Sequence, residues 1–197
     1  MNQLFDTQVP AIKGLVLAGG RSVRMGQDKG LIPWHGKPQR EYLVLLLESL
    51  GLPAYISCRP DQAADLEAYP VIVDQLADQG PLGAIYSAFQ TDPQSAWLVL
   101  ACDMPLLDAG VIRYLLEQRN PALAATAYRA PAFSDHSPDP LAAIWEPAIL
   151  PVIERRLLAG LRCARKALAE AGVHVLDAPD PLKLSNVNTP EDLDRMR

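Results

Sequence analysis

The sequence predicts an α/β fold, a Rossmann-like arrangement in which one mostly parallel sheet carries helices on both of its faces. The first supporting observation is that short apolar runs of strand length alternate with longer segments of helical spacing along the chain. The second is that four glycine-rich or polar segments each directly follow one of the apolar runs: the glycine-rich loop that begins at Gly19, the segment over 57–59, the segment over 74–83, and Asp103. Because ligands bind at the carboxyl ends of the strands in such sheets, we expect these four segments to form one site.

The domain boundaries follow from the same pattern. The first twelve residues contain no strand-like or helical pattern, and we expect 1–12 to form a flexible N-terminal arm. The remaining residues, 13–197, fit a single domain, since single domains commonly reach about 200 residues.

In the first half of this domain, glycine and proline mark the ends of the regular segments. The apolar run over 13–18 stops at two glycines, and the leucine-rich helical pattern over 40–50 stops at Gly51 and Pro53. Pro70 closes a further helical pattern in the same way. The expected elements are strands over 13–18, 54–58, 71–73 and 97–101 and helices over 40–50, 61–69 and 82–90.

In the second half, capping residues and turn-forming residues separate the elements. Asp108 can cap a helix over 111–119, and the Pro-, Ser- and Asp-rich stretch over 129–139 is typical of an exposed loop. Thr189 and Pro190 indicate a helix start, because a hydroxyl caps well and proline fits the first turn. The expected elements are strands over 123–128, 141–145 and 173–176 and helices over 111–119, 147–159 and 162–171.

The composition excludes several classes of protein. A formal net charge of −5 is unlike that of proteins that bind nucleic acid through a basic face. The three cysteines are scattered and form no CxxC pair, which argues against disulfides and a zinc site. No apolar run approaches the ~20 residues of a membrane helix, and the N-terminal residues do not resemble a secretory signal. We therefore expect a cytoplasmic protein that binds neither nucleic acid nor membranes.

The first polar segment is a glycine-rich loop with basic residues. Its start, over 17–20, lets the backbone approach a ligand closely and direct N–H groups at it. Arg21, Arg24 and Lys29 then add positive charge suited to phosphate oxygens. The spacing matches neither the P-loop nor the dinucleotide fingerprint. A glycine turn with solvated charges is the alternative, but the order of these residues after a buried strand favours a phosphate-binding loop.

A single carboxylate follows the apolar run over 97–101. Asp103 stands at the end of this run, and Pro105 stops further strand pairing. Mg²⁺ at phosphate sites commonly takes one or two carboxylates, with phosphates and water completing its shell. The alternative is that Asp103 caps the next helix, but Asp108 is better placed for that role. The pattern therefore favours a magnesium ligand.

Two further segments carry weaker signals. Asp74 follows the run over 71–73, and Gly80 lies in the loop after it, so a contact with a nucleoside is one interpretation and an ordinary turn is the other. Asn186 and Asn188 alternate just before the helix start at Thr189, and their amides either enter a cleft or simply form a turn. Spacing alone leaves both alternatives open.

Four blocks of the sequence resemble the molybdenum cofactor guanylyltransferases, a family of nucleotidyltransferases with a glycosyltransferase-A-like fold. In chain order the blocks are LAGGRSVRMGQDKGLIPWHGKP, VDQLADQGPLGAI, LACDMPLL and NVNTPEDL. The resemblance extends over the chain from Lys13 onward. It implies a Mg²⁺-dependent enzyme that transfers GMP from GTP to molybdopterin, forms the guanine dinucleotide cofactor and releases pyrophosphate.

The resemblance also implies roles for individual residues. Arg24, Lys29 and Asp103 would be catalytic, and Asp103 would also bind the metal ion. Asn186 and Asn188 match a block placed near the pterin end of the cleft and would bind the acceptor substrate. The implied nucleotide-binding residues are Leu17, Ala18, Gly19, Gly20, Lys29, Ser57, Asp74, Gly80 and Asp103. Because the family hands its product on to molybdenum enzymes, contacts with other proteins of the cofactor pathway and with acceptor molybdoenzymes are implied as well.

One position departs from the family pattern, and one bears on the choice of base. Ser57 or Arg59 stands where the family often has an asparagine that contacts GTP. Gly19 takes the place of an alanine that is usual in members that use CTP, which favours a purine. Two alternatives stay open: cytidylyl or other nucleotidyl transfer to a phosphorylated acceptor, and a non-catalytic GTP-binding adaptor.

Overall fold

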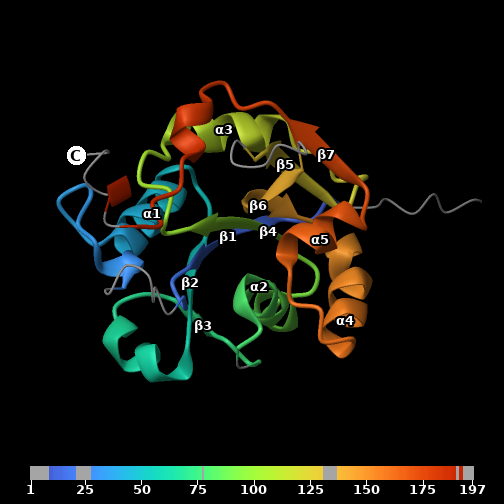
Figure 1. The fold of residues 1–197 in the computed structure, drawn as a ribbon, viewed down its shortest axis with the longest axis horizontal. Helices are drawn as coiled ribbons and strands as arrows, with labels where there is room; N and C mark the ends of the chain where they lie inside the picture. The colour runs from blue at the N-terminus through green and yellow to red at the C-terminus, as the bar shows by residue number, and fades with distance from the viewer. Residues whose placement is uncertain (1–8, 21–27, 77, 131–136, 190, 193–197) are drawn as a thin grey trace, which may run out of the picture.

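A seven-stranded sheet in the order β3-β2-β1-β4-β6-β5-β7 forms the centre of the molecule (Figure 1). The computed structural model describes residues 9–20, 28–76, 78–130, 137–189 and 191–192. The strands are β1 (Ile12–Leu17), β2 (Ala54–Cys58), β3 (Val71–Val73), β4 (Ala96–Ala101), β5 (Ala125–Arg129), β6 (Pro138–Trp145) and β7 (Val173–Leu176). Only β6 runs antiparallel to its neighbours, β4 and β5. The predicted α/β fold with a mostly parallel sheet is therefore confirmed.

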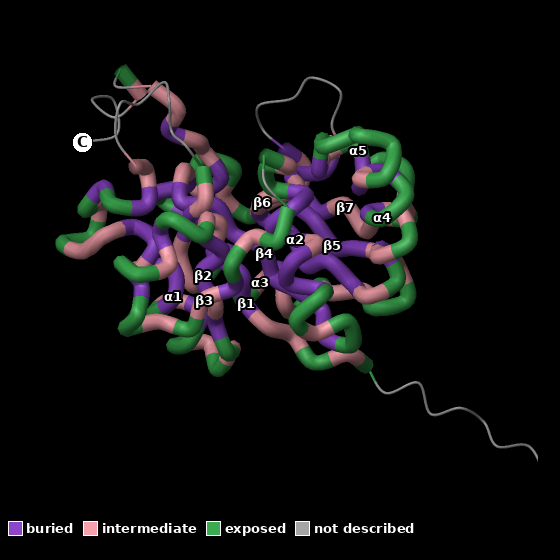
Figure 2. Tube along the Cα trace, turned by 90° about the horizontal axis from the view of Figure 1, so that it is seen from below, coloured by how far each residue is buried: buried purple, intermediate pink, exposed green. Residues whose placement is uncertain are grey.

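Helices cover both faces of this sheet, as predicted. The α-helices are α1 (Gln39–Ser49), α2 (Gly80–Thr91), α3 (Ala109–Glu117), α4 (Leu150–Leu158) and α5 (Ala164–Ala169), and the short 3-10 helices are η1 (Lys29–Leu31), η2 (Pro60–Leu66), η3 (Pro147–Ile149) and η4 (Pro181–Leu184). Leu47 of α1 and Ile112 of α3 pack on one face, and Phe89 of α2 and Leu168 of α5 pack on the other. The buried strands run through the middle of the molecule between these layers (Figure 2).

The segment between β2 and β3 differs from the prediction. The sequence predicts a helix over 61–69, and the structure has a 3-10 helix, η2, that ends earlier, at Leu66. The turns close between residues three apart, since Gln62 N donates to Arg59 O at 3.0 Å and Tyr69 N donates to Leu66 O at 2.9 Å. Proline bounds this segment at each end, and 3-10 helices are usual in such short connecting pieces.

The strand β6 also begins earlier than predicted, inside the stretch expected to be a loop. Pro138 already pairs with Arg129 of β5, and the register shifts between Ala127 and Arg129. Asp139 Oδ1 accepts a hydrogen bond from Leu141 N at 2.9 Å. Prolines in this stretch suggested a loop, but proline is tolerated where a strand is irregular or just beginning. Residues 131–136, the middle of the predicted loop, lie outside the described residues.

The remaining boundaries agree with the prediction to within a few residues. Asp108 caps α3, its side chain accepting from Val111 N at 3.0 Å. Thr189 accepts from Asp192 N at 3.2 Å, and Asp192 accepts in return from Thr189 N at 3.0 Å, so the predicted cap forms. The helix α2 begins at Gly80, whose φ of 58° is a conformation that favours glycine. No helix in the described part of the chain is long and apolar enough to cross a membrane.

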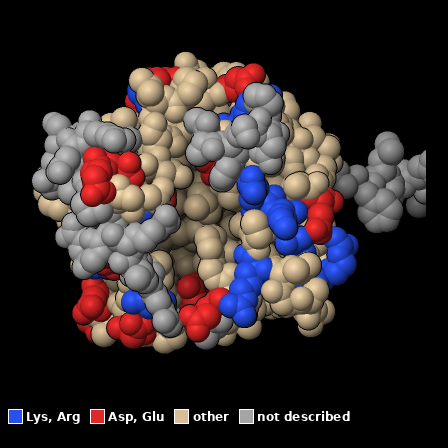
Figure 3. Space-filling model, in the orientation of Figure 1, with Lys and Arg blue, Asp and Glu red and all other residues tan. Residues whose placement is uncertain are grey.

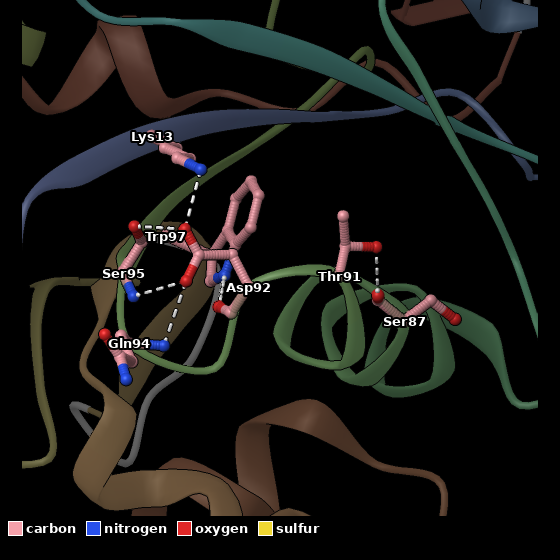
Figure 4. A network of polar contacts seen from close by, with 7 residues as sticks. All are labelled: Lys13, Ser87, Thr91, Asp92, Gln94, Ser95 and Trp97. Carbon is pink, nitrogen blue, oxygen red and sulfur yellow. Dashed lines mark hydrogen bonds and ion pairs between the residues drawn. The ribbon is translucent and has the colours of Figure 1, made fainter.

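An ion pair links Lys13 of β1 to Asp92, the residue that directly follows α2. Asp92 accepts hydrogen bonds from Lys13 Nζ at 2.6 Å and from Ser95 Oγ at 2.7 Å (Figure 4). The Lys13 ammonium also lies 5.9 Å from the ring centroids of Tyr55 and Trp97. These hydrogen bonds, led by that from Lys13, hold the pKa of Asp92 well below its usual range. These contacts connect β1, the end of α2 and the residue before β4.

Replacing Asp92 with asparagine is expected to lower the free energy of unfolding by about 2 kcal/mol at neutral pH, because hydrogen bonds to a charged acceptor are lost. The folded-state pKa lies below the ordinary value of 3.8, so the stabilisation is complete above that value. It is lost as the pH falls through the lowered pKa. Denaturant unfolding of both proteins at neutral pH and in acid measures this difference, which should shrink in acid. The exposed Asp65→Asn variant should match the wild type, and an unchanged Asp92→Asn would contradict the role of the pair.

Candidate active site

A cavity of about 490 Å³ opens where the parallel strands end. Its lining comes from one strand tip after another across the sheet: Asp74 follows β3, Ser57 lies in β2, Gly19 follows β1, Asp103 follows β4 and Leu141 lies in β6. Parallel strands bring their carboxyl ends to one edge, which is why these segments meet although they are far apart in the sequence. The prediction that the four polar segments form one site agrees with this arrangement.

A polar pair stands at the end of the cavity formed by β2 and β3. Ser57 is fully buried, and its hydroxyl donates to Asp74 Oδ1 at 2.6 Å. Burial raises the pKa of Asp74, although the bond from Ser57 and the charge of Arg59 oppose the shift. A Cβ atom on Gly19 would lie only 2.9 Å from Asp74 Oδ2. This end of the cavity therefore offers a fixed acceptor group packed against the glycine turn.

A basic and an acidic side chain meet at the other end, beside β4. Lys29 opens η1, where the Asp28 carboxylate caps the helix by accepting from Gly30 N at 2.8 Å. The Lys29 ammonium donates to Asn188 Oδ1 at 2.7 Å and lies 3.7 Å from Asp103 Oδ2. Both charged side chains are only 18% exposed. Three segments thus place a cation, an anion and an amide at one point of the cavity.

Asp103 has the properties of a ligand for a hard cation. Its Oδ1 is buried and has no hydrogen-bond partner within the part of the chain that the structure describes. Burial raises the pKa of this carboxyl group, and Lys29 opposes the shift. The described residues contain no group of three His, Cys, Asp or Glu side chains that could hold a metal ion. One unsatisfied carboxylate oxygen fits an ion such as Mg²⁺, which takes its other ligands from phosphates and water.

Most of the residues predicted for the site come together. The predicted residues that line the cavity are Leu17, Ala18, Gly19, Gly20, Lys29, Ser57, Asp74, Gly80, Asp103 and Asn188. Asn186 is not among the lining residues, and its buried Oδ1 has no hydrogen-bond partner in the described part of the structure. Arg24 lies outside the described residues, so its predicted role stays a prediction. The backbone of Asp103 binds the predicted C-terminal block, because Val187 N donates to its carbonyl oxygen at 2.7 Å.

Sequence reasoning missed several residues of the cavity wall. Gln79 and Pro81 line it at the start of α2, and Leu141 lines it from β6. Gln62 does not line the cavity but bonds to the loop that does. A glutamine in a short 3-10 helix carries no sequence signal for such a contact. Leu141 belongs to an apolar run that looks like any buried strand.

Positive charge gathers beside a hollow in the face drawn in Figure 3. The chain as a whole carries a formal net charge of −5, so this gathering is local. One basic residue is anchored to the cavity wall, since Arg162 donates to the backbone oxygen of Asp78 at 3.0 Å. A local excess of positive charge near a cavity attracts anionic ligands such as phosphates.

A family model described as "MobA-like NTP transferase domain" matches residues 14–175. The chain belongs to this family. Its nucleotidyltransferase relatives include a molybdenum cofactor guanylyltransferase of Pseudomonas putida, which is 35% identical over 94% of this chain and 97% of its own length. A molybdenum cofactor biosynthesis bifunctional protein of Synechocystis is 33% identical over 95% of this chain, which spans only 54% of that longer protein.

A solved structure supports membership of the NTP transferase family as well. The molybdopterin-guanine dinucleotide biosynthesis protein A of Archaeoglobus fulgidus superposes with a TM-score of 0.77 at 25% identity. The match covers 93% of this chain and 95% of the other. The cavity therefore lies in an NTP transferase domain whose whole fold, and not only a local motif, is shared with relatives.

In this NTP transferase domain, replacing Gly19 with alanine is expected to displace the Asp74 carboxylate, because the new Cβ would lie 2.9 Å from Asp74 Oδ2. We expect nucleotide affinity to fall about tenfold and the free energy of unfolding to fall by about 1 kcal/mol. Nucleotide titration and thermal unfolding measure the two effects. Gly20→Ala is the matched control for stability, since its Cβ would meet no described atom within 4 Å. Equal melting temperatures for both variants would contradict the packing argument.

Proposed function

We propose that this chain transfers GMP from GTP to molybdopterin and releases pyrophosphate. The observation that carries the proposal is the meeting of Lys29 and Asp103, 3.7 Å apart, beside the glycine turn in the cavity. A glycine turn with a lysine binds phosphate, and a neighbouring carboxylate adds a site for the metal ion that phosphoryl transfer needs. The names of the relatives supply the substrates: guanylyl transfer and molybdenum cofactor biosynthesis.

The two ends of the cavity carry different side chains, and this difference suits the proposed reaction. The nucleoside of GTP would lie at the end with Ser57 and Asp74, and its phosphates at the end with Lys29 and Asp103. The acceptor would then approach from the side of Asn188, which bonds to Lys29 at 2.7 Å. The acceptor would then lie beside the phosphates of GTP, as transfer to the α-phosphorus requires.

Chemistry at the α-phosphorus would then be a single displacement. A terminal phosphate oxygen of molybdopterin forms a bond to the α-phosphorus of GTP as the bond to the β-phosphate oxygen breaks. No protein nucleophile is needed, because the acceptor itself carries the attacking oxygen. The chain contributes positioning and charge: the Lys29 ammonium lies where negative charge develops, and the backbone of the glycine turn holds the nucleotide.

Asp103 is the residue that would hold Mg²⁺. When bound, the ion neutralises phosphate charge and orients the triphosphate. The unsatisfied Oδ1 of Asp103 supports this assignment. Burial raises the pKa of Asp103, and Lys29 opposes this rise, since a nearby cation favours the ionised form.

The proposal is tested by incubating the purified chain with molybdopterin, Mg²⁺ and one of GTP, CTP or ATP. Pyrophosphate release and the dinucleotide product are measured together. We expect turnover with GTP and little with CTP or ATP. Turnover with CTP in place of GTP would make the chain a cytidylyltransferase. Tight GTP binding with no turnover under any condition would make it a non-catalytic adaptor.

A further inference from the structure

The side-chain amide of Gln62 lies between the two ends of the glycine-rich loop. Its Nε2 donates to Ala18 O at 3.3 Å and to Asp28 Oδ2 at 3.0 Å. Its Oε1 accepts from Arg59 N at 3.1 Å, which fixes the orientation of the amide. Gln62 is only 7% exposed. One side chain of η2 therefore contacts both the residue before the two glycines and the residue before Lys29.

At the first end of the loop, these contacts set the direction of the backbone. Gln62 Nε2 donates to the carbonyl oxygen of Ala18, and Arg59 Nη1 donates to the carbonyl oxygen of Gly19 at 2.8 Å. In a trans peptide the C=O and the following N–H point in opposite directions. With both carbonyl oxygens turned to the side of η2, the N–H groups of Gly19 and Gly20 point away from it. They are then oriented as donors before any ligand arrives.

At the second end, the same amide fixes the residue that presents Lys29. Asp28 uses one carboxylate oxygen to accept from Gln62 and the other to accept from Gly30 N. The second bond starts η1, and Lys29 is the first residue of that helix. A shift of the Asp28 carboxylate would therefore move the start of η1 and with it the ammonium group of Lys29.

From these contacts we infer that Gln62 is a positioning residue for the nucleotide. It fixes the distance between the backbone donors at Gly19 and Gly20 and the ammonium group of Lys29, so that both can bind one nucleotide. The inference rests on the proposed nucleotide binding and concerns a residue that does not itself line the cavity. A group that is held in place before binding loses less conformational entropy when the ligand binds, which raises the affinity.

Three variants of Gln62 test this role. Gln62→Met keeps the length of the side chain and removes its hydrogen bonds, and we expect the Kd for GTP to rise about tenfold. Gln62→Glu keeps the shape but sets a carboxylate against Ala18 O and Asp28, and we expect a larger rise. In the double variant Q62E with Asp28→Asn, the new amide of residue 28 can donate to the new carboxylate. We expect part of the lost affinity to return.

The measurements separate positioning from simple structural support. The Kd for GTP is determined by titration at a temperature at which thermal unfolding shows each variant to be fully folded. Gln90→Glu, an exposed change at the far end of α2 from the cavity, is the control for added charge and should bind as the wild type does. A lower melting temperature with unchanged Kd in Gln62→Met would make Gln62 a structural residue and overturn the inference.

The wild type distinguishes this failure from failure of the proposed function. Wild-type protein that binds and turns over GTP while the Gln62 variants do so equally well refutes the positioning role alone. Wild-type protein that neither binds nor turns over GTP refutes the proposed function, and the role of Gln62 toward the nucleotide with it. If Gln62→Met and Gln62→Glu both bind GTP more weakly and the double variant recovers no affinity, the Gln62–Asp28 contact is not the link to Lys29.

Discussion

Replacing Asp103 with asparagine is expected to reduce nucleotidyl transfer by about 10³-fold. Asparagine keeps the size of the side chain but removes the negative charge that would hold Mg²⁺ and face Lys29. The pKa of Asp103 is raised by burial, so the charged form is disfavoured in the folded protein and the neutral amide should not destabilise the fold. Pyrophosphate release at saturating GTP and acceptor, together with thermal unfolding, measures both outcomes.

The matched control for this variant is Asp65→Asn, an exposed change on η2 that should leave turnover as it is. The metal dependence gives a second criterion. Wild-type activity should rise steeply with Mg²⁺ concentration, whereas the residual activity of Asp103→Asn should depend on it only weakly. Full activity of Asp103→Asn with an unchanged Mg²⁺ requirement would show that the metal ion is held elsewhere.

Lys29→Met is expected to lower kcat/KM for GTP by about 100-fold, because a charge-assisted contact to the phosphates is lost in the transition state. Methionine keeps most of the aliphatic length, so packing beside Asn188 and Asp103 should be preserved. Steady-state kinetics with GTP as the varied substrate measures the effect. Lys166→Met removes an exposed lysine of α5 and should leave kcat/KM for GTP unchanged.

The Lys29 variant also separates two possible roles of the ammonium group. A rise in KM with constant kcat would mean that the lysine only binds the ground state, whereas a fall in kcat would mean that it stabilises the transition state. We expect kcat to fall, since the ammonium group lies beside the carboxylate at which the metal ion would sit. Unchanged kinetics would remove Lys29 from the site altogether.

The elements that the sequence predicted well are those with a strong periodic signal. The run before Gly19 and the run before Asp103 are mostly apolar, and both are strands whose ends deliver site residues as expected. The weaker predictions failed where local chemistry has two outcomes. Prolines near Pro138 suited either a loop or the irregular start of a strand, and only pairing with Arg129 decides between them.

The site shows the same division. Lys29 and Asp103 follow buried strands in recognisable blocks, so their meeting could be expected from the order of the sheet. Gln62 could not be found in this way, because its partners lie 44 and 34 residues away and no pattern in the sequence links them. For Gly19 the expected reason was room for a purine, and the structure adds a different neighbour, the carboxylate of Asp74.

The hydrogen bond between Lys29 and Asn188 determines when, during synthesis of the chain, the phosphate end of the cavity can form. These residues are 159 positions apart, so a growing chain presents the lysine long before its amide partner exists. The first four strands of the sheet, the glycine turn and Asp103 have all been synthesised by then, but a single domain generally folds as one unit. The phosphate end of the cavity is completed only when the segment around Asn188 has left the ribosome and closed over it.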